Sequence, residues 1–203
     1  MKKVLVSTAF ILGLVGLTGC GQPAPQTPDF SKCYDEGNVQ APKWVCDGGA
    51  TMEGGVFAVG SASARKAGGI QFQRTIATQN ARNALAMQMG VKVKRMLKQY
   101  QSTTGTGDNE TFEQAITDVS KQVTSQTLIG SKIVDTWSNP KTHTLHVLVG
   151  MKDNVVKKSV KNAVNTTFKN NQALWQEFKS QKAQAELDAA VNREFSGNSG
   201  NNQ

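Results

Sequence analysis

The sequence predicts an α+β fold, a two-layer domain with a small antiparallel sheet covered by long helices, plus a C-terminal helical extension. Three segments rich in β-branched residues, 56–63, 131–137 and 143–149, predict the strands. Two longer stretches, 70–100 and 110–127, have apolar residues at helical spacing and lie between the first strand and the other two. Helices placed in this way are expected on one face of the sheet.

The three predicted strands carry different local signals. The first contains Gly60, which indicates a close approach by another backbone or a bulge. The other two flank an Asn-Pro turn at 139–140 and are predicted to form a hairpin. Apolar residues alternate along 143–149, which places His146 on the face opposite to them.

The predicted helix over 70–100 combines small residues with a basic surface. Ala77 and Ala84 recur at heptad spacing and allow close packing on a sheet or on another helix, whereas Gly90 weakens the middle of the pattern. Its basic residues are Arg74, Arg82, Lys92, Lys94, Arg95 and Lys98. The next helix, 110–127, has one apolar face.

The chain is predicted to be helical again from Lys152 onward, and the α+β domain is expected to span 41–165. Residues 166–195 are interpreted as a helical extension available to partner copies. Its apolar residues Leu174, Trp175 and Phe178 are the candidate interface, with packing inside the domain as the alternative. The Gly/Asn/Ser-rich end, 196–203, is expected to be disordered.

The N-terminal segment has the pattern of a signal peptide. Two lysines precede an apolar run from Val4 to Leu17, which is shorter than the roughly 20 residues of a membrane-spanning helix. Thr18-Gly19-Cys20 follows, and the whole resembles a bacterial lipoprotein signal. That resemblance implies cleavage after residues 1–19 and lipidation of Cys20; an uncleaved anchor or an ordinary secretory signal is the alternative. Residues 20–40 are then a lipidated, Pro-rich tether.

Lipidation of Cys20 determines the expected location of the chain. Stable anchoring takes more than one acyl chain, because each buried CH₂ contributes roughly 0.8 kcal/mol. Such lipoproteins with Asp after the cysteine tend to stay at the inner membrane, and Gly21 here implies the outer membrane, facing the periplasm. The formal charge is +8, or about +6 without Lys2 and Lys3. Such a charge favours binding to anionic lipid headgroups or cell-wall polymer, and the alternative is an ordinary charged surface that keeps the protein soluble. Nucleic acid is not an expected partner outside the cytoplasm.

The remaining cysteines, Cys33 and Cys46, form an even pair in an oxidising compartment. They are expected to form a disulfide, with two free thiols as the alternative, and their spacing is not that of a zinc or redox motif. The two histidines, His143 and His146, point to opposite faces of a strand, which is unsuitable for chelating one metal. We find no nucleophile motif or phosphate loop either. We therefore expect no enzyme activity, no metal and no cofactor besides the lipid on Cys20.

Four segments, 42–45, 57–62, 81–86 and 147–150, occur in an order and spacing that resemble the Lpp-twenty family of outer-membrane lipoproteins, nearest its flagellar branch. The resemblance covers about 41–155. It implies a structural protein that oligomerises into a ring or disk around the flagellar motor, and it offers no catalytic residues. The Cys33/Cys46 pair and the long C-terminal tail depart from the family pattern.

The favoured hypothesis is therefore a lipid-anchored homo-oligomer with flagellar or envelope protein partners, needed for motility. One alternative is an envelope lipoprotein whose basic residues, on 70–100 and on 152–161, bind peptidoglycan or another acidic component. A further alternative is a surface antigen without a flagellar role.

Overall fold

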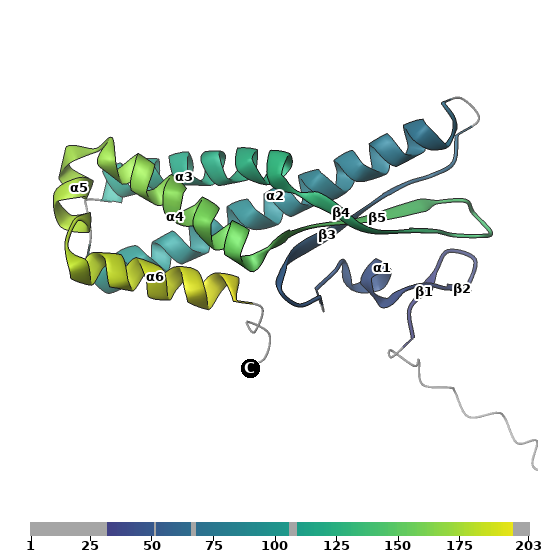
Figure 1. Cartoon of the computed structure of the whole chain (residues 1–203), viewed down its shortest axis with the longest axis horizontal. Coiled ribbons are helices and arrows are strands. Elements are labelled where there is room, and N and C mark those ends of the chain that lie inside the picture. Colours follow the sequence, from purple (N-terminus) through teal and green to yellow (C-terminus); the bar gives the residue numbers. More distant parts are fainter. Residues whose placement is uncertain (1–31, 51, 66–67, 106–108, 197–203) are drawn as a thin grey trace, which may run out of the picture. The chain divides into compact units, whose positions relative to one another are not determined.

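The main sheet of the computed structural model has three antiparallel strands in the order β3-β5-β4 (Figure 1). These are β3 (Gly55–Ala62), β4 (Lys132–Ser138) and β5 (Leu145–Lys152). The structure describes residues 32–50, 52–65, 68–105 and 109–196, which lie in one compact unit, 31–203. The predicted signal peptide, Cys20 and almost all of the predicted 196–203 tail lie outside the described residues.

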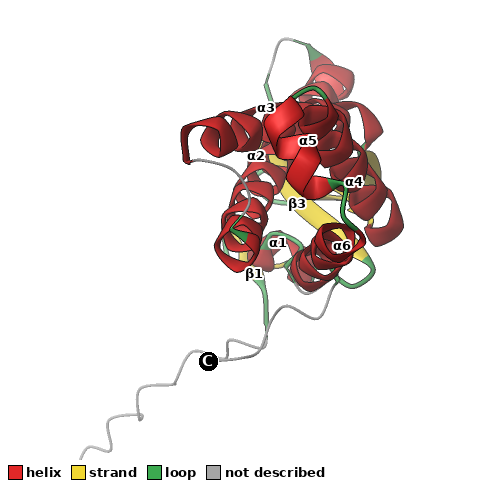
Figure 2. Cartoon of the chain, turned by 90° about the vertical axis from the view of Figure 1, so that its left-hand side faces the viewer, coloured by secondary structure: helices red, strands yellow, loops and turns green. Residues whose placement is uncertain are grey.

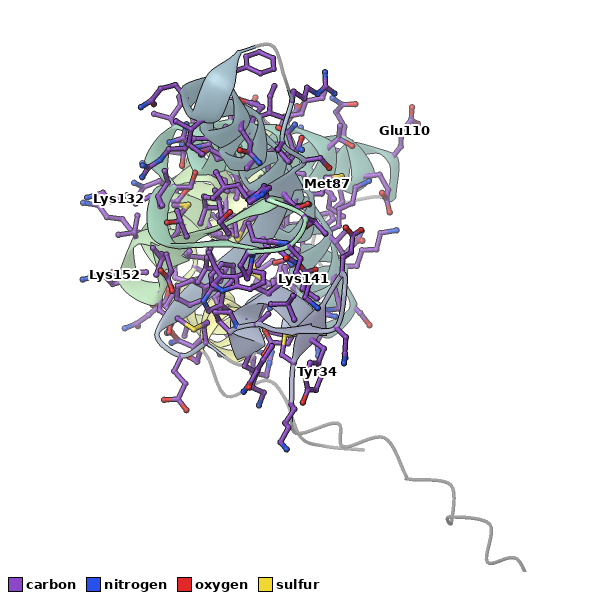
Figure 3. All side chains as sticks on the ribbon, turned by 90° about the vertical axis from the view of Figure 1, so that its right-hand side faces the viewer. Tyr34, Met87, Glu110, Lys132, Lys141 and Lys152 are labelled. Atoms are coloured by element: carbon purple, nitrogen blue, oxygen red, sulfur yellow. A yellow bond between two sulfur atoms is a disulfide. The ribbon has the colours of Figure 1, made fainter. Side chains whose placement is uncertain are left out.

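The predicted hairpin is confirmed. β4 and β5 pair around the turn, with Trp137 opposite His146, and the register shifts between Ile133 and Asp135. β5 is the central strand because β3 pairs along its other edge, with Gly60 opposite Val147. Near one end of the hairpin, Lys132 lies opposite Gly150, and Lys132 and Lys152 project on the same side of the unit (Figure 3).

Both faces of β5 are buried, and alternation divides its residues between two environments. Leu145, Val147, Val149 and Met151 face the helices and belong to the main hydrophobic core. Leu148 is also fully buried but lies outside that core, on the outer face of the sheet with His146. The predicted two layers are therefore present, and a further covering lies on the outer face.

Helix α2 (Gly69–Thr104) covers the inner face of the sheet, where it packs on β3 and β5. Gly60 allows this contact, because a Cβ at this position would lie 2.1 Å from the backbone nitrogen of Ala81. The sequence signal for close backbone approach is thus confirmed. Gly90 does not interrupt the helix, which extends past both predicted ends.

The remaining helices are α3 (Asn109–Gly130), α4 (Asp153–Lys169), α5 (Gln172–Phe178) and α6 (Gln181–Phe195). α3 packs on α2 and α4, α5 packs on α4, and α6 packs on both α2 and α4 (Figures 1 and 2). Ion pairs support the α6 contacts, with Arg95 bound to Glu194 and Lys161 Nζ 2.7 Å from Asp188 Oδ1.

The predicted C-terminal helices are present, but they are not an unpartnered extension. The expected boundary at 165 lies inside α4, and the main core continues to Phe195. Leu174 and Phe178 are fully buried, so the prediction that they face partner copies is wrong for these two residues. The Phe178 ring lies 4.8 Å from that of Phe168, while Trp175 is only partly buried against the core.

The segment before β3 is more ordered than a tether. It forms the short hairpin β1 (Tyr34–Asp35) and β2 (Val39–Gln40), followed by helix α1 (Lys43–Asp47). Gly37 and Asn38 adopt positive φ in the turn, which these two residue types tolerate best. The tether predicted over 20–40 is therefore replaced by folded structure from Tyr34 onward.

Candidate functional site

The N-terminal segment forms a clamp on the outer face of the sheet, at the point where the predicted membrane tether meets the fold. We call residues 33–50 the junction clamp. Its disulfide joins Cys33 to Cys46, with 5.7 Å between their Cα atoms, so the predicted pairing is confirmed. A cross-link of this sequence separation stabilises a fold by roughly 3 kcal/mol in the chain-entropy model.

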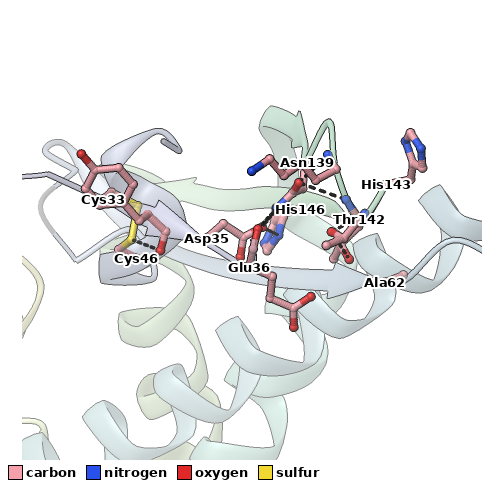
Figure 4. A network of polar contacts seen from close by, with 12 residues as sticks. Cys33, Asp35, Glu36, Cys46, Ala62, Asn139, Thr142, His143 and His146 are labelled. Atoms are coloured by element: carbon pink, nitrogen blue, oxygen red, sulfur yellow. Dashed lines mark hydrogen bonds and ion pairs between the residues drawn. A yellow bond between two sulfur atoms is a disulfide. The ribbon is translucent and has the colours of Figure 1, made fainter. Parts of the chain in front are cut away.

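A polar network holds the β1–β2 hairpin of the clamp against the β4–β5 turn (Figure 4). Asn139 Nδ2 donates to Asp35 Oδ2 at 2.8 Å and also to the carbonyl of Glu36 at 2.9 Å. The same Asp35 oxygen lies 3.1 Å from His146 Nε2. Asn139 is fully buried, and its own side-chain oxygen accepts hydrogen bonds from the backbone of Lys141 and Thr142.

Helix α1 contributes the second attachment of the clamp. Trp44 is buried, and its Nε1 donates to Asp135 Oδ2 on β4 at 3.0 Å. Gly49 approaches the sheet so closely that an added Cβ would lie 3.0 Å from Leu148 Cδ1. The clamp thus covers the outer face of β5.

The environment of Asp35 favours its charged form. Burial on its own raises the pKa of the carboxyl, but the hydrogen bonds from Asn139 and from the Glu36 backbone, with the attraction of His146, outweigh it. The net pKa of Asp35 is below its ordinary value of 3.8. Asp35 is therefore an ionised acceptor at neutral pH.

Replacement of Asp35 by Asn should destabilise the fold in a pH-dependent way. Since the folded-state pKa is lowered, the carboxylate stabilises the fold above pH 3.8, and this contribution is lost as the pH falls through the lowered value. We expect a loss of about 1–2 kcal/mol in the free energy of unfolding at pH 7, and a smaller loss at pH 3. Urea unfolding of the wild type and the variant at both pH values measures the difference in the free energy of unfolding. Glu36→Gln, on the exposed neighbouring residue, is the charge control, and an equal loss at both pH values would contradict the assignment.

The region between α1 and β5 also matches a known family. The match to the family model described as LPP20 lipoprotein runs over residues 42–152, more than half of the 203 residues. The chain belongs to the LPP20 lipoprotein family. It is thus an envelope lipoprotein. No curated protein matches the chain.

The LPP20 match covers the sheet, α1, α2 and α3, and it ends where α4 begins. The clamp disulfide has one cysteine inside the match, Cys46, and one before it, Cys33. The C-terminal helices complete the core of this family domain from outside the matched region. None of the described helices is both long and apolar enough to cross a membrane.

The predicted site residues of this LPP20 protein lie in separate places. Cys20 falls outside the described residues, and the core helices hold Leu174 and Phe178. His143 lies exposed in the β4–β5 turn with a positive φ of 57°, whereas His146 belongs to the clamp network. Within the described ranges, no group of three or more His, Cys, Asp or Glu side chains is placed to hold a metal ion.

Sequence reasoning missed the polar half of the clamp. Asp35 lies between Cys33 and Cys46 in the sequence. Their disulfide holds this loop together, so the cysteine spacing was a signal that Asp35 belongs to folded structure. The Asn-Pro dipeptide was interpreted only as a turn. The buried contacts of Asn139 across to residues 35 and 36 depend on tertiary packing and leave no periodic pattern.

Proposed function

We propose that this LPP20 lipoprotein is held in the outer membrane by lipid on Cys20, faces the periplasm and assembles with copies of itself. The observation that carries the proposal is the family match over 42–152 on a chain whose first 19 residues resemble a lipoprotein signal followed by Cys20. Gly21 in place of Asp supports the outer membrane. The residues between Cys20 and the junction clamp serve as the tether.

Self-assembly is supported by apolar side chains that the described part of the chain leaves exposed. Near the start of α2, Ile70 is 61% and Phe72 is 44% exposed, and Ile76 lies on the same helix end at 36%. β3 and β4 are edge strands of the main sheet, and an edge strand can pair with another chain. A second copy that buries these groups removes apolar surface from water.

The flagellar part of the proposal is supported by the resemblance to the flagellar branch of the family. There, oligomers in the outer membrane form a ring or disk around the motor and are needed for motility. Head-to-tail contacts between copies close into a ring when the rotation between them fits. The proposed role is structural rather than catalytic.

Deletion of the gene tests the flagellar role. We expect loss of swimming with flagellar filaments still present, restored by the wild-type gene but not by a Cys20→Ala variant that lacks the lipid site. Normal swimming of the deletion strain would contradict the flagellar role and favour the surface antigen.

Sedimentation of the mature lipidated chain in detergent tests self-assembly. The wild type is expected to form large discrete oligomers, and a Phe72→Glu/Ile76→Glu variant smaller ones, because charge at an apolar contact opposes burial. Gln99→Glu, exposed elsewhere on α2, is the matched control and should behave as wild type. A strictly monomeric wild type at high concentration would refute self-assembly.

A second candidate function is binding to an acidic envelope polymer such as peptidoglycan. It is favoured by the basic residues that project together from the sheet, Lys132 and Lys152 (Figure 3). Pelleting of the chain with purified cell wall that weakens as salt rises would support this function. Absence of pelleting at low salt would remove it.

A further inference from the structure

A cationic groove lies between α2 and the edge strand β4. Because α2 contacts the sheet chiefly at β3 and β5, the helix-facing side of β4 is left partly open, and Ile133 on β4 is 38% exposed. The opening forms a groove of about 240 Å³. We call it the α2–β4 groove. It is separate from the junction clamp, which lies on the other face of the sheet.

The wall of the α2–β4 groove is polar apart from Ile133, and it carries two guanidinium groups. Two neighbouring stripes of α2 supply it at helical i, i+4 spacing, one of Gln and Thr residues and one of Arg and Thr residues. Together with Ile133, the lining residues are Gln71, Thr75, Gln79, Arg74, Thr78 and Arg82. None of the lining residues is acidic, so nothing in the lining neutralises the two guanidinium groups.

The arginines of the groove differ from Arg95 further along the same helix. Arg95 is bound to Glu194, which raises the pKa of its guanidinium through a hydrogen bond and charge attraction. Arg74 and Arg82 have no ion-pair partner among the described residues, and the Nε of Arg82 is buried without a hydrogen bond. A buried donor left unpaired is unfavourable, so the hydrogen-bonding capacity of Arg82 is not fully used in the described structure.

We propose that the α2–β4 groove binds a phosphate monoester group. A monoester carries a charge of about −1.5 to −2 at neutral pH and three strong acceptor oxygens, which match the two guanidiniums and the amide donors of Gln71 and Gln79. The Thr75 hydroxyl already donates to the carbonyl of Gln71. A carboxylate offers one charge and two oxygens and leaves part of this donor set unused. The group can come from a phosphorylated lipid headgroup or from free phosphate. The groove residues support this site whether or not the chain assembles with copies of itself.

Calorimetric titration of the mature lipidated chain in detergent, at constant ionic strength, tests the proposal. The probes are inorganic phosphate, dihexanoyl phosphatidic acid as a monoester headgroup, dihexanoyl phosphatidylglycerol as a diester, and acetate. We expect both monoanionic controls, the diester and acetate, to bind at least about tenfold more weakly than phosphatidic acid. Phosphatidic acid binding about tenfold tighter than phosphate would identify a lipid headgroup as the source; equal affinities would identify the phosphate group alone.

Two outcomes would overturn the proposal. One is no heat of binding with either phosphate or phosphatidic acid. The other is acetate or the diester binding as tightly as phosphatidic acid, which would show attraction to any negative charge rather than recognition of a monoester.

Arginine variants assign the binding to the groove. Arg74→Gln and Arg82→Gln should each weaken phosphatidic acid binding by about tenfold or more, since each removes charge-assisted hydrogen bonds. Arg82→Lys keeps the charge but loses the planar fork, and should give an intermediate loss. Lys94→Gln, an exposed residue of the same helix, is the control for charge and should leave the affinity within about twofold.

Thermal unfolding of each variant separates binding from folding. Arg74 is exposed, so Arg74→Gln should retain the wild-type unfolding midpoint even if the partly buried Arg82 does not tolerate replacement. Wild-type affinity in the folded Arg74→Gln and Arg82→Gln variants would place binding elsewhere and overturn the assignment. The oligomer size of both arginine variants should equal that of the wild type. A failure of phosphate binding can therefore be distinguished from a failure of self-assembly.

Discussion

Replacement of Gly60 by Ala is expected to destabilise this protein by about 3 kcal/mol or more, at the upper end of the range for overpacked cores. The new Cβ would lie 2.1 Å from Ala81 N and 2.5 Å from the carbonyl oxygen of Ala77. Both are backbone atoms of α2, so no side-chain rotation relieves the clash. β3 and α2 would have to separate, and chemical denaturation monitored by circular dichroism measures the loss.

Gly90→Ala provides the matched control on α2 itself. Its Cβ would meet only the Thr124 hydroxyl oxygen, at 3.5 Å, which is an ordinary contact. Because Ala is the better helix former, this change should stabilise the protein by about 0.5–1 kcal/mol. Equal effects of the two substitutions would show that the approach of α2 to β3 does not depend on Gly60.

Replacement of Phe178 by Ala is expected to cost about 3–5 kcal/mol, the usual loss for a fully buried aromatic side chain. Phe178 is fully buried, and its ring packs edge-on against Phe168, whose ring in turn lies 5.8 Å from that of Phe112. The cavity would therefore open between α5, α4 and α3. Denaturant unfolding of the chain in detergent measures the change.

Phe178→Ala also distinguishes a core role from an interface role. Gln172→Ala, exposed on the same helix, is the control and should change the stability by less than about 0.5 kcal/mol. If Phe178 served an interface instead, its replacement would reduce oligomer size while the unfolding free energy stayed at the wild-type value.

Local patterns predicted much of the fold because their causes are local. Alternation along 143–149 and the Asn-Pro turn led to the hairpin, and helical spacing led to α2 and α3. Gly60 and Ala77 indicated close backbone packing before any partner was known. Two cysteines in an oxidising compartment indicated their pairing.

The errors arose where distant segments meet. The apolar stripe of the C-terminal helices was visible in the sequence, but the pattern does not say which surface buries it, and we assigned it to a partner copy. In the structure α6 lies against α2 and α4, with Glu194 held by Arg95. The folded N-terminal clamp was missed for the same reason, since Asp35 and Asn139 are far apart in the sequence.

The sequence by itself determined the α+β class, the hairpin, the disulfide pair and the family, because periodicity, turn residues and motif order are properties of neighbouring residues. Tertiary structure alone decided that the last helices complete the core, that the clamp covers the outer face of β5, and that Arg74 and Arg82 line one groove. Each of these depends on which surfaces pack against one another when the apolar side chains become buried. Burial is non-directional, so the shapes of the packed elements select the contacts.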